Sequence, residues 1–322
     1  MKKSTKIWLI IASALTVLGL LVSTAALAIA GFDFRILSQH KTKISTFEID
    51  EDFENISIKA DTADITFLPS ENEKTKVVIC EREDYAPSAS VDDSTLKISS
   101  RGELKWYQHI SIFDLSDRKI TVYLPRTHYA SLTIDSDTGD VDIPKTFSFG
   151  SLNIDLSTGD VKCRASVENA LKIKTSTGDI TVNGTSAGSL DLTVSTGQIT
   201  ASSVDVENDI KIKVSTGKTE LSDITAKNLS TSGNTGDIKL KNVIISEKLS
   251  ISRSTGDVTL DRCDASEIKI VTDTGEVNGS LLSEKVFFVK SDTGDIRVPQ
   301  TMNGGKCDIT TDTGDINITI AK

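Results

Sequence analysis

The sequence predicts an all-β protein: a parallel β-solenoid of ten rungs of 19–20 residues, preceded by one N-terminal transmembrane helix. Thr-Gly recurs ten times at a spacing of 19 or 20 residues, and such a fixed period is typical of repeat architectures. Apolar residues recur at fixed distances from each glycine, and an uncharged N-terminal stretch predicts the helix. The repeated glycines are Gly139, Gly159, Gly178, Gly197, Gly217, Gly236, Gly256, Gly275, Gly294 and Gly314.

The uncharged stretch covers residues 7–30 and follows three lysines within residues 1–6. At about 1.5 Å per residue it spans roughly 36 Å as a helix, which is enough to cross a bilayer. The preceding lysines predict that residues 1–6 form a cytoplasmic stub and that the rest lies outside, in a single-pass cell-membrane protein. The alternative is a signal peptide cleaved after residues 28–30. The stretch is longer than a usual signal-peptide core, so we favour the anchor.

The segment between the helix and the repeats is less regular. We expect residues 31–43 to be a linker and residues 44–130 to form an N-terminal cap with irregular β rungs. Asp61-Thr62-Ala63-Asp64 is a degenerate copy of the repeated corner, and terminal repeats are usually atypical. Residues 131–322 are the regular repeats. The chain stops just after the last corner, which predicts an exposed sheet edge there.

Each Thr-Gly lies between two short apolar alternations. Residues seven and five before the glycine, and two and four after it, are apolar in nearly every copy, with Thr231, Thr219 and Gly279 as exceptions. A period of two marks a strand with one buried face. In the second copy these positions are Leu152, Ile154, Val161 and Cys163.

The Thr-Gly dipeptide is predicted to be a corner between stacked rungs and not a hairpin. Tight hairpins prefer type I′ or II′ turns. Type I′ requires positive φ at both central residues, which β-branched Thr resists, and type II′ places Gly first. Ser-Thr-Gly-Asp fits a type II turn. The inward-facing residues also lie at odd distances before the glycine and at even distances after it, as expected if the chain bends there. We expect the alternation between 19 and 20 residues to be absorbed six to twelve residues past each glycine.

Outward-facing charges are predicted to fix the register of neighbouring rungs. Stacking would place Asp155 beside Lys174, and Asp191 between Lys172 and Lys211. Each such pair contributes only about 0.2–1 kcal/mol, but a slipped register would bring like charges together.

Composition restricts the classes of partner. The formal net charge is −10, which argues against nucleic acid and against electrostatic adhesion to anionic lipid.

The chain has four cysteines. Cys163 and Cys307 fall on buried positions many rungs apart, and Cys263 shares a position with Val204, Ile224, Val243 and Leu282. Because a disulfide needs Cα atoms within about 7 Å, we expect core thiols.

Few motifs suggest catalysis. Asp-Thr-Gly is also the triplet of aspartic proteases, but here it is a variant of the Ser-Thr-Gly corner. The histidines, His40, His109 and His128, lie outside the repeats and are not spaced as a ligand pair. A carbohydrate-active β-helix enzyme is an alternative, although the repeats contain almost no aromatic residues. We expect no enzyme. The triplets begin at Asp137, Asp273, Asp292 and Asp312.

The residue after the glycine is usually acidic. Such side chains can cap local backbone N–H groups, as Asp does in turns. They can also form a cation ladder, since calcium prefers clustered carboxylates. Calcium therefore stays open as a ligand, and no other cofactor is expected. The candidate cation edge is Asp273, Glu276, Asp292, Asp295, Asp312 and Asp315.

The N-terminal anchor followed by Gly31-Phe32-Asp33-Phe34, the segment Ile120 to Pro125 and the repeated corner resembles the DUF4097 family of bacterial adhesin-like proteins, which includes the LiaG-like envelope proteins. The resemblance covers about residues 31–322 and implies a membrane-tethered extracytoplasmic β-solenoid without catalytic residues. The first functional hypothesis is a surface protein that binds a wall component, a peptide or a membrane protein. The second is an envelope-stress sensor or decoy that binds cationic peptides. The oligomeric state is left open.

Overall fold

The computed structural model describes residues 42–83, 85–101 and 118–321, together with scattered helical residues between Ala12 and Ala28. Among these described residues no helix has the length and apolar character needed to cross a membrane. Of the helix expected over residues 7–30, only the scattered helical residues are described, so the transmembrane anchor stays a prediction. Residues 31–41 of the expected linker lie outside the described residues, whereas Thr42 and Lys43 already belong to the first strand of the cap.

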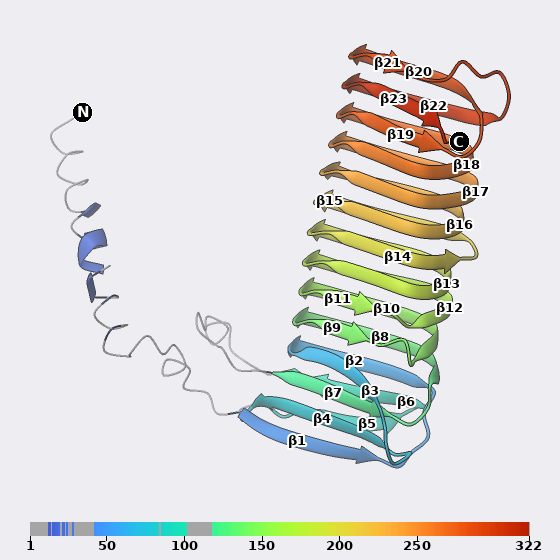
Figure 1. Cartoon of the computed structure of the whole chain (residues 1–322). Helices are drawn as coiled ribbons and strands as arrows, with labels where there is room; N and C mark the ends of the chain where they lie inside the picture. The colour runs from blue at the N-terminus through green and yellow to red at the C-terminus, as the bar shows by residue number, and fades with distance from the viewer. Residues whose placement is uncertain are drawn as a thin grey trace.

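The repeats stack as parallel strands, one rung per repeat (Figure 1). Leu132 pairs with Leu152 and Leu152 pairs with Leu171, so equivalent positions form columns along the stack. The predicted parallel β-solenoid is therefore confirmed. The strands of the first eight rungs are β8 (His128–Thr138), β9 (Val141–Ile143), β10 (Ser148–Thr158), β11 (Val161–Cys163), β12 (Ser166–Thr177), β13 (Ile180–Thr196), β14 (Ile199–Val206), β15 (Asp209–Thr216), β16 (Thr219–Thr235), β17 (Ile238–Thr255), β18 (Val258–Thr274) and β19 (Val277–Leu281).

The Thr-Gly dipeptides are corners, but they are not type II turns. Every corner glycine has positive φ, for example +141° at Gly159, which is far from the value of about +80° in a type II turn. The N–H of Gly159 donates to the carbonyl of Thr177 on the next rung, at 2.9 Å. The corner is therefore held by its neighbour along the stack and not by a local turn bond.

In the third to seventh copies a second kink lies six residues past the corner glycine. Residues there adopt the left-handed conformation, with φ of +54° at Ser203 and +55° at Asp223. Register shifts come next, for example between Ala226 and Asn228. The 19/20 alternation is absorbed nine to eleven residues past Gly217, within the predicted stretch, and the segment there is strand.

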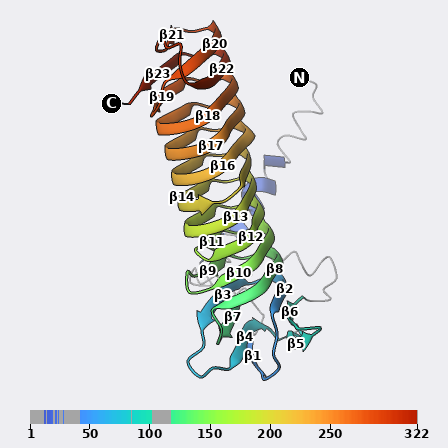
Figure 2. The same cartoon turned by 90° about the vertical axis from the view of Figure 1, so that its right-hand side faces the viewer.

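The predicted inward columns are buried in the first eight rungs, except at Gly279. A further inward column lies three residues before each glycine, where buried Leu156 and Val194 alternate with buried polar residues such as Thr175. The Thr175 hydroxyl donates to the carbonyl of Gly159, at 3.2 Å. Because this column mixes polar and apolar residues, the sequence pattern did not reveal it. Figure 2 shows the stack from its narrow side.

The last two copies stack out of sequence order, which corrects the prediction of ten sequential rungs. Ile268 of the eighth copy pairs with Cys307 of the tenth, and Cys307 pairs on its other side with Phe287 of the ninth. The ninth copy is therefore outermost, and the exposed edge belongs to it and not to the end of the chain. The strands are β20 (Lys285–Thr293), β21 (Ile296–Arg297), β22 (Gly305–Thr313) and β23 (Ile316–Ile320).

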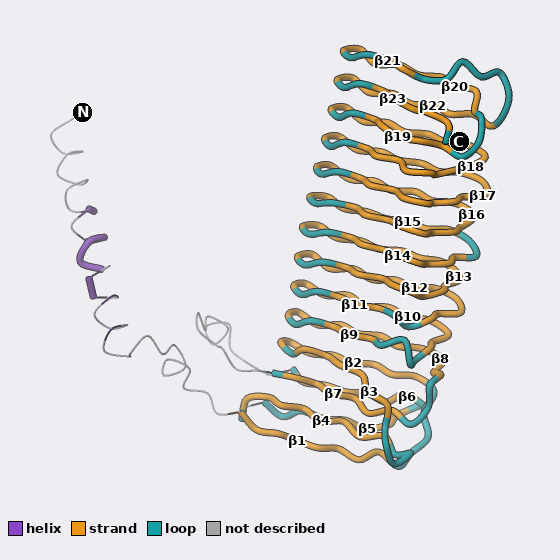
Figure 3. The backbone as a smooth tube through the Cα atoms, in the orientation of Figure 1, coloured by secondary structure: helices purple, strands orange, loops and turns teal. Residues whose placement is uncertain are grey.

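Two glycines let the chain pass between the eighth and ninth copies, after the loop of residues 298–304 (Figure 3). A Cβ atom on Gly304 would lie 1.8 Å from the carbonyl oxygen of Glu284, and one on Gly305 would lie 1.9 Å from that of Ser266. Only glycine permits such close backbone approach.

The cap contains two further parallel rungs and a set of antiparallel strands. Thr62 stacks on Thr138, which confirms residues 61–64 as a degenerate corner. Strands β6 and β7 pair with β2 and β3. Strands β1, β4 and β5 run antiparallel to their partners and close this end. The cap strands are β1 (Thr42–Ile49), β2 (Asn55–Thr62), β3 (Asp64–Pro69), β4 (Thr75–Arg82), β5 (Ser88–Asp92), β6 (Thr95–Ser100) and β7 (Lys119–Leu124).

Candidate functional site

The ten Thr-Gly corners lie above one another and form one edge of the solenoid, which we call the corner edge (Figure 1). The threonine before each glycine is exposed and in register with its neighbours, as in the row Thr158, Thr177 and Thr196. The corner edge therefore presents the same hydroxyl at every rung, about 4.8 Å apart.

The acidic residues after the glycines form a ladder of hydrogen bonds along the corner edge. The backbone N–H of Asp160 donates to Oδ1 of Asp140 at 2.8 Å, and that of Asp179 donates to Oδ1 of Asp160 at 2.8 Å. These residues do cap backbone N–H groups, but the prediction of a local cap is wrong, because each of these carboxylates accepts from the neighbouring rung and not from its own turn. Bonds of this kind to an ionised acceptor are strong, which offsets repulsion between stacked carboxylates.

The six residues of the candidate cation edge lie at the last three corners, in the reordered sequence of rungs. Asp295 donates its N–H to Oδ1 of Asp315, at 2.8 Å. Asp295 also pairs with Arg297 at 2.9 Å, and Asp292 pairs with Lys290 at 2.7 Å. Across the described ranges no group of three or more His, Cys, Asp or Glu is arranged to hold a metal ion. Calcium binding at this edge stays a prediction.

The Asp-Thr-Gly triplets occupy exposed corners, as the corner interpretation predicts. His128 lies on β8 with Nδ1 3.1 Å from the hydroxyl of Ser148. His40 and His109 lie outside the described residues. Two of the predicted outward charges, Asp155 and Lys174, form an ion pair at 3.0 Å.

The four cysteines are free thiols. Burial raises the pKa of Cys163 and of Cys307 to about 12, and that of Cys263 to about 11. These three thiols are core residues and poor nucleophiles at neutral pH. Cys263 pairs with Leu281, whereas Leu282, predicted for that column, is 38% exposed. The register shift between Leu260 and Cys263 explains the difference.

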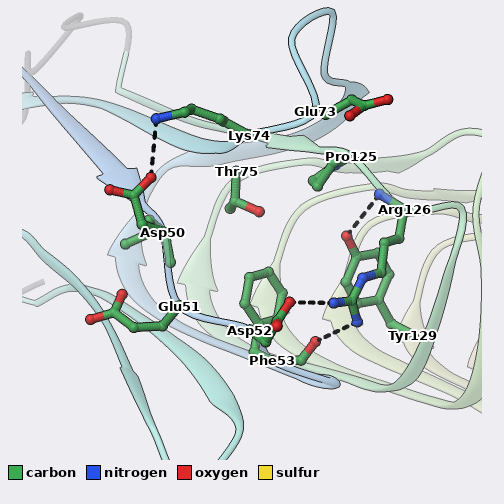
Figure 4. A pocket seen from close by; sticks show the side chains of 11 residues that line it. Asp50, Glu51, Asp52, Phe53, Glu73, Lys74, Thr75, Pro125, Arg126 and Tyr129 are labelled. Carbon is green, nitrogen blue, oxygen red and sulfur yellow. Dashed lines mark hydrogen bonds and ion pairs between the residues drawn. The ribbon is translucent and has the colours of Figure 1, made fainter.

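The structure also shows a cleft in the cap, of about 360 Å³, which we call the cap cleft (Figure 4). Three separate segments line it, residues 49–53, 73–75 and 125–129. Sequence reasoning missed it because these segments meet only in the fold. The one local signal was the acidic run at residues 50–52.

Side chains of the cap cleft pair mainly with one another. Arg126 forms an ion pair with Asp52 and donates its backbone N–H to the Tyr129 hydroxyl, at 3.3 Å. The Tyr129 ring stacks on Phe53, with centroids 5.6 Å apart, and burial raises its pKa. Lys74 pairs with Asp50 at 3.2 Å. Both basic residues of the lining, Lys74 and Arg126, are thus paired with acids of the same cleft, and we assign the cleft a structural role.

Comparison with solved structures supports the fold. A crystal structure from Parabacteroides distasonis, described as a "putative lipid binding protein", superimposes with a TM-score of 0.50 at 19% identity, over 74% of this chain and 96% of that one. A "putative adhesin" from Bacteroides fragilis gives 0.45 at 15% identity, over 87% and 97% of the two chains. One from Parabacteroides merdae gives 0.40 at 14% identity, over 87% and 96%. No curated protein matches the chain.

The family comparison covers most of the sequence. The family described as Toastrack DUF4097 matches residues 53–208 and again residues 203–322. The two matches together include the inner rungs of the cap and every regular corner. The chain therefore belongs to the DUF4097 family.

Proposed function

We propose that this chain is a membrane-anchored, extracytoplasmic, non-enzymatic, adhesin-like protein that binds a component of the cell envelope through its corner edge. The observation that carries the proposal is the corner edge itself, where exposed threonines stack in register on a rigid scaffold. A wall polymer with regularly spaced polar groups can contact many rungs at once. Such multivalent contact strengthens binding even where each contact is weak.

The predicted anchor and the fold are consistent with this role. The described chain enters the solenoid through β1 at the cap, and the ninth copy lies at the opposite end (Figure 1). A helix over residues 7–30 would hold the cap near the membrane, and the corner edge would run outward from it. Membership of the DUF4097 family, which the sequence analysis associates with adhesin-like proteins, supports the adhesin-like class.

The proposal is tested by binding of the detergent-solubilised full chain to purified wall sacculi. Replacing Thr177, Thr196 and Thr216 together by Val removes three neighbouring hydroxyls from the corner edge, and we expect binding to fall about tenfold. The matched control changes Thr46, Thr133 and Thr259 to Val, because all three are exposed but lie off the corner edge. Equal binding by the two variants would reject the corner edge as the binding surface.

A second candidate function is an envelope-stress sensor or decoy that binds cationic peptides. The acidic corners and the net charge of −10 favour it. A short lysine-rich peptide would then bind at low salt, and salt or the double change Asp292→Asn and Asp295→Asn would abolish binding. The control is Asp205→Asn with Glu247→Gln, both exposed on other faces. Peptide binding that survives in the corner variant would argue against this candidate.

Calcium at the same edge is tested separately, by calorimetric titration of the full chain at millimolar calcium. Heat that disappears in the Asp292→Asn, Asp295→Asn variant would support a cation edge. A flat titration would remove calcium from the proposal.

A further inference from the structure

The end of the solenoid formed by the ninth copy, which we call the open end, carries an uncovered strand edge. Strand β20 pairs with β22 and strand β21 pairs with β23, and in the described part of the chain neither has a partner on its other side. Apolar side chains remain exposed there: Phe288 is 54% exposed, Ile296 42% and Met302 92%. Ile316, which occupies the same column as Ile296 one rung inward, is fully buried.

The two ends of the solenoid differ. The cap end is finished by the antiparallel strands β1, β4 and β5. At the open end the repeat pattern continues to the outermost strands, so the inward columns end there with no further strand packed over them. Terminal repeats of solenoids usually carry a polar outer face, and an apolar strand edge is otherwise a site of pairing with another chain.

We propose that the open end pairs with the open end of a second copy of this chain, in antiparallel register about a two-fold axis. The charges of the edge strands are self-complementary in this arrangement. In β20, Lys290 and Asp292 flank Ser291, and in β21, Asp295 and Arg297 flank Ile296. An antiparallel pair centred on Ser291 and Ile296 therefore sets a cation opposite an anion in both strands.

A single two-fold axis can pair both β20 and β21 with their counterparts in the second copy. Ser291 lies three residues before Gly294 and Ile296 lies two residues after it, so the two positions are equally far from the centre of the Thr-Gly corner. A two-fold axis through that end of the rung passes near both. The contact is isologous, so it closes as a dimer and leaves no further edge for growth.

This pairing has a geometric consequence. The cap ends of the two copies lie at opposite ends of the doubled rod. If each chain is anchored as proposed above, the dimer joins two membrane surfaces and not two neighbours on one surface. That consequence rests on the proposed anchor, whereas the dimer itself does not.

The experiment measures self-association of the full chain in detergent by sedimentation over a range of concentrations. We expect a monomer–dimer equilibrium for the wild type. Lys290→Asp sets like charges opposite one another twice in the dimer, and we expect the dissociation constant to rise at least about tenfold. The double change Lys290→Asp with Asp292→Lys reverses the order of the charges but keeps them self-complementary, so we expect the dimer to return.

Two further variants test where the contact lies. Phe288→Lys with Ile296→Lys should give a monomer of unchanged thermal stability, because both side chains are exposed. Ile44→Lys is the matched control at the cap end, where Ile44 is 68% exposed on β1, and it should leave the dimer intact.

A wild-type monomer at every concentration would overturn the proposal, as would failure of the charge reversal to rescue Lys290→Asp. Oligomers lost in Ile44→Lys would instead indicate head-to-tail assembly. Monomeric variants that still bind wall sacculi would show that the dimer and the proposed function are independent of one another.

Discussion

At the scale of the residue, the corner glycines satisfy two requirements that no other residue meets. Gly197 has φ of +144°, and a Cβ atom on it would lie 2.1 Å from the carbonyl oxygen of Gly178 on the preceding rung. The first requirement is conformational, and the second comes from the close approach of stacked backbones. The repeated glycine therefore reflects the spacing between rungs as much as the turn itself.

Gly197→Ala should lower the free energy of unfolding by about 2–5 kcal/mol, because it combines backbone strain with a clash against fixed backbone. Chemical denaturation monitored by circular dichroism measures the change. Gly184→Asn is the control: Gly184 has φ of +61° and no atom near its missing Cβ, so Asn should be nearly neutral there. A Gly197→Ala variant as stable as the control would contradict the close-approach argument.

A second residue-scale feature is the buried Arg253, which occupies the column three residues before the glycine. Its Nη1 donates to the carbonyl of Val214 at 2.8 Å, and burial lowers its pKa. Gly233 lies on the rung between, and a Cβ atom there would lie 1.8 Å from the carbonyl oxygen of Val214 and 2.2 Å from Nη1 of Arg253. The small residue makes room for the large one.

Gly233→Val should therefore destabilise the chain by about 1–3 kcal/mol through overpacking. The double change Gly233→Val with Arg253→Val removes the contact with Nη1 but keeps the contact with the Val214 carbonyl, so we expect it to recover only part of the stability that the single variant loses. Denaturant titration of the two variants and of Arg253→Val completes a double-mutant cycle. Additive effects would show that the two positions are independent.

The buried thiols make stability fall at high pH. The pKa of Cys163 is about 12 in the folded chain against an ordinary value of 9.0, so the unfolded chain loses its proton first. The stabilising contribution is complete below pH 9 and is lost as the pH rises from 9 towards 12. In Cys163→Ala we expect the loss of stability between pH 8 and pH 10.5 to be smaller by about 1–2 kcal/mol. Urea titrations at the two pH values test this, and identical losses would contradict it.

At the scale of the element, a buried ion pair holds the crossing that reorders the last rungs. The Lys285 side chain is 4% exposed and lies 2.6 Å from Asp264. It also donates to the Ser283 hydroxyl at 2.6 Å. Asp264 belongs to β18 of the eighth copy, whereas Lys285 begins β20 of the ninth. The pair therefore fixes the ninth copy relative to the eighth across the inserted tenth copy.

Lys285→Met leaves Asp264 without its buried partner, and we expect a loss of about 2–3 kcal/mol that is confined to the last rungs. Hydrogen exchange of β20 to β23 measures it locally. Lys306→Met is the matched control, because Lys306 pairs with Asp308 in an exposed position on the inner strand β22 and should change protection little. Uniform loss of protection along the whole solenoid would show that the crossing is not an independent unit.

At the scale of the whole molecule, the solenoid is close to one-dimensional, since each rung contacts mainly the rungs on either side. Stability is then roughly the sum of rung and interface contributions. Removal of a complete rung should shorten the stack without breaking the columns.

Deletion of residues 198–217 removes the segment from one corner glycine to the next. We expect a folded chain with the same circular dichroism per residue and a smaller denaturant m-value, because less surface is exposed on unfolding. Deletion of residues 198–207 removes only half a rung and puts the inward columns out of register, so we expect loss of cooperative unfolding. Similar behaviour of the two deletions would contradict the column model.

The sequence by itself determined the solenoid, its corners and its inward columns, because each is encoded within one repeat by the period of two and the Thr-Gly signal. It also placed the acidic residues on one edge. The hydrogen-bond ladder through Asp140 and Asp160 could not be derived, since it depends on which backbone N–H of the next rung lies within reach.

Only the tertiary structure decided the order of the last rungs, the antiparallel cap and the cap cleft. A local sequence pattern cannot distinguish the ninth copy from the tenth, because Phe287 and Cys307 occupy the same inward position of the repeat. Which of them becomes terminal depends on competition between strand edges far apart in the chain, on the passage allowed by Gly304 and Gly305, and on the buried Lys285. Those contacts join different rungs, and no single repeat contains them.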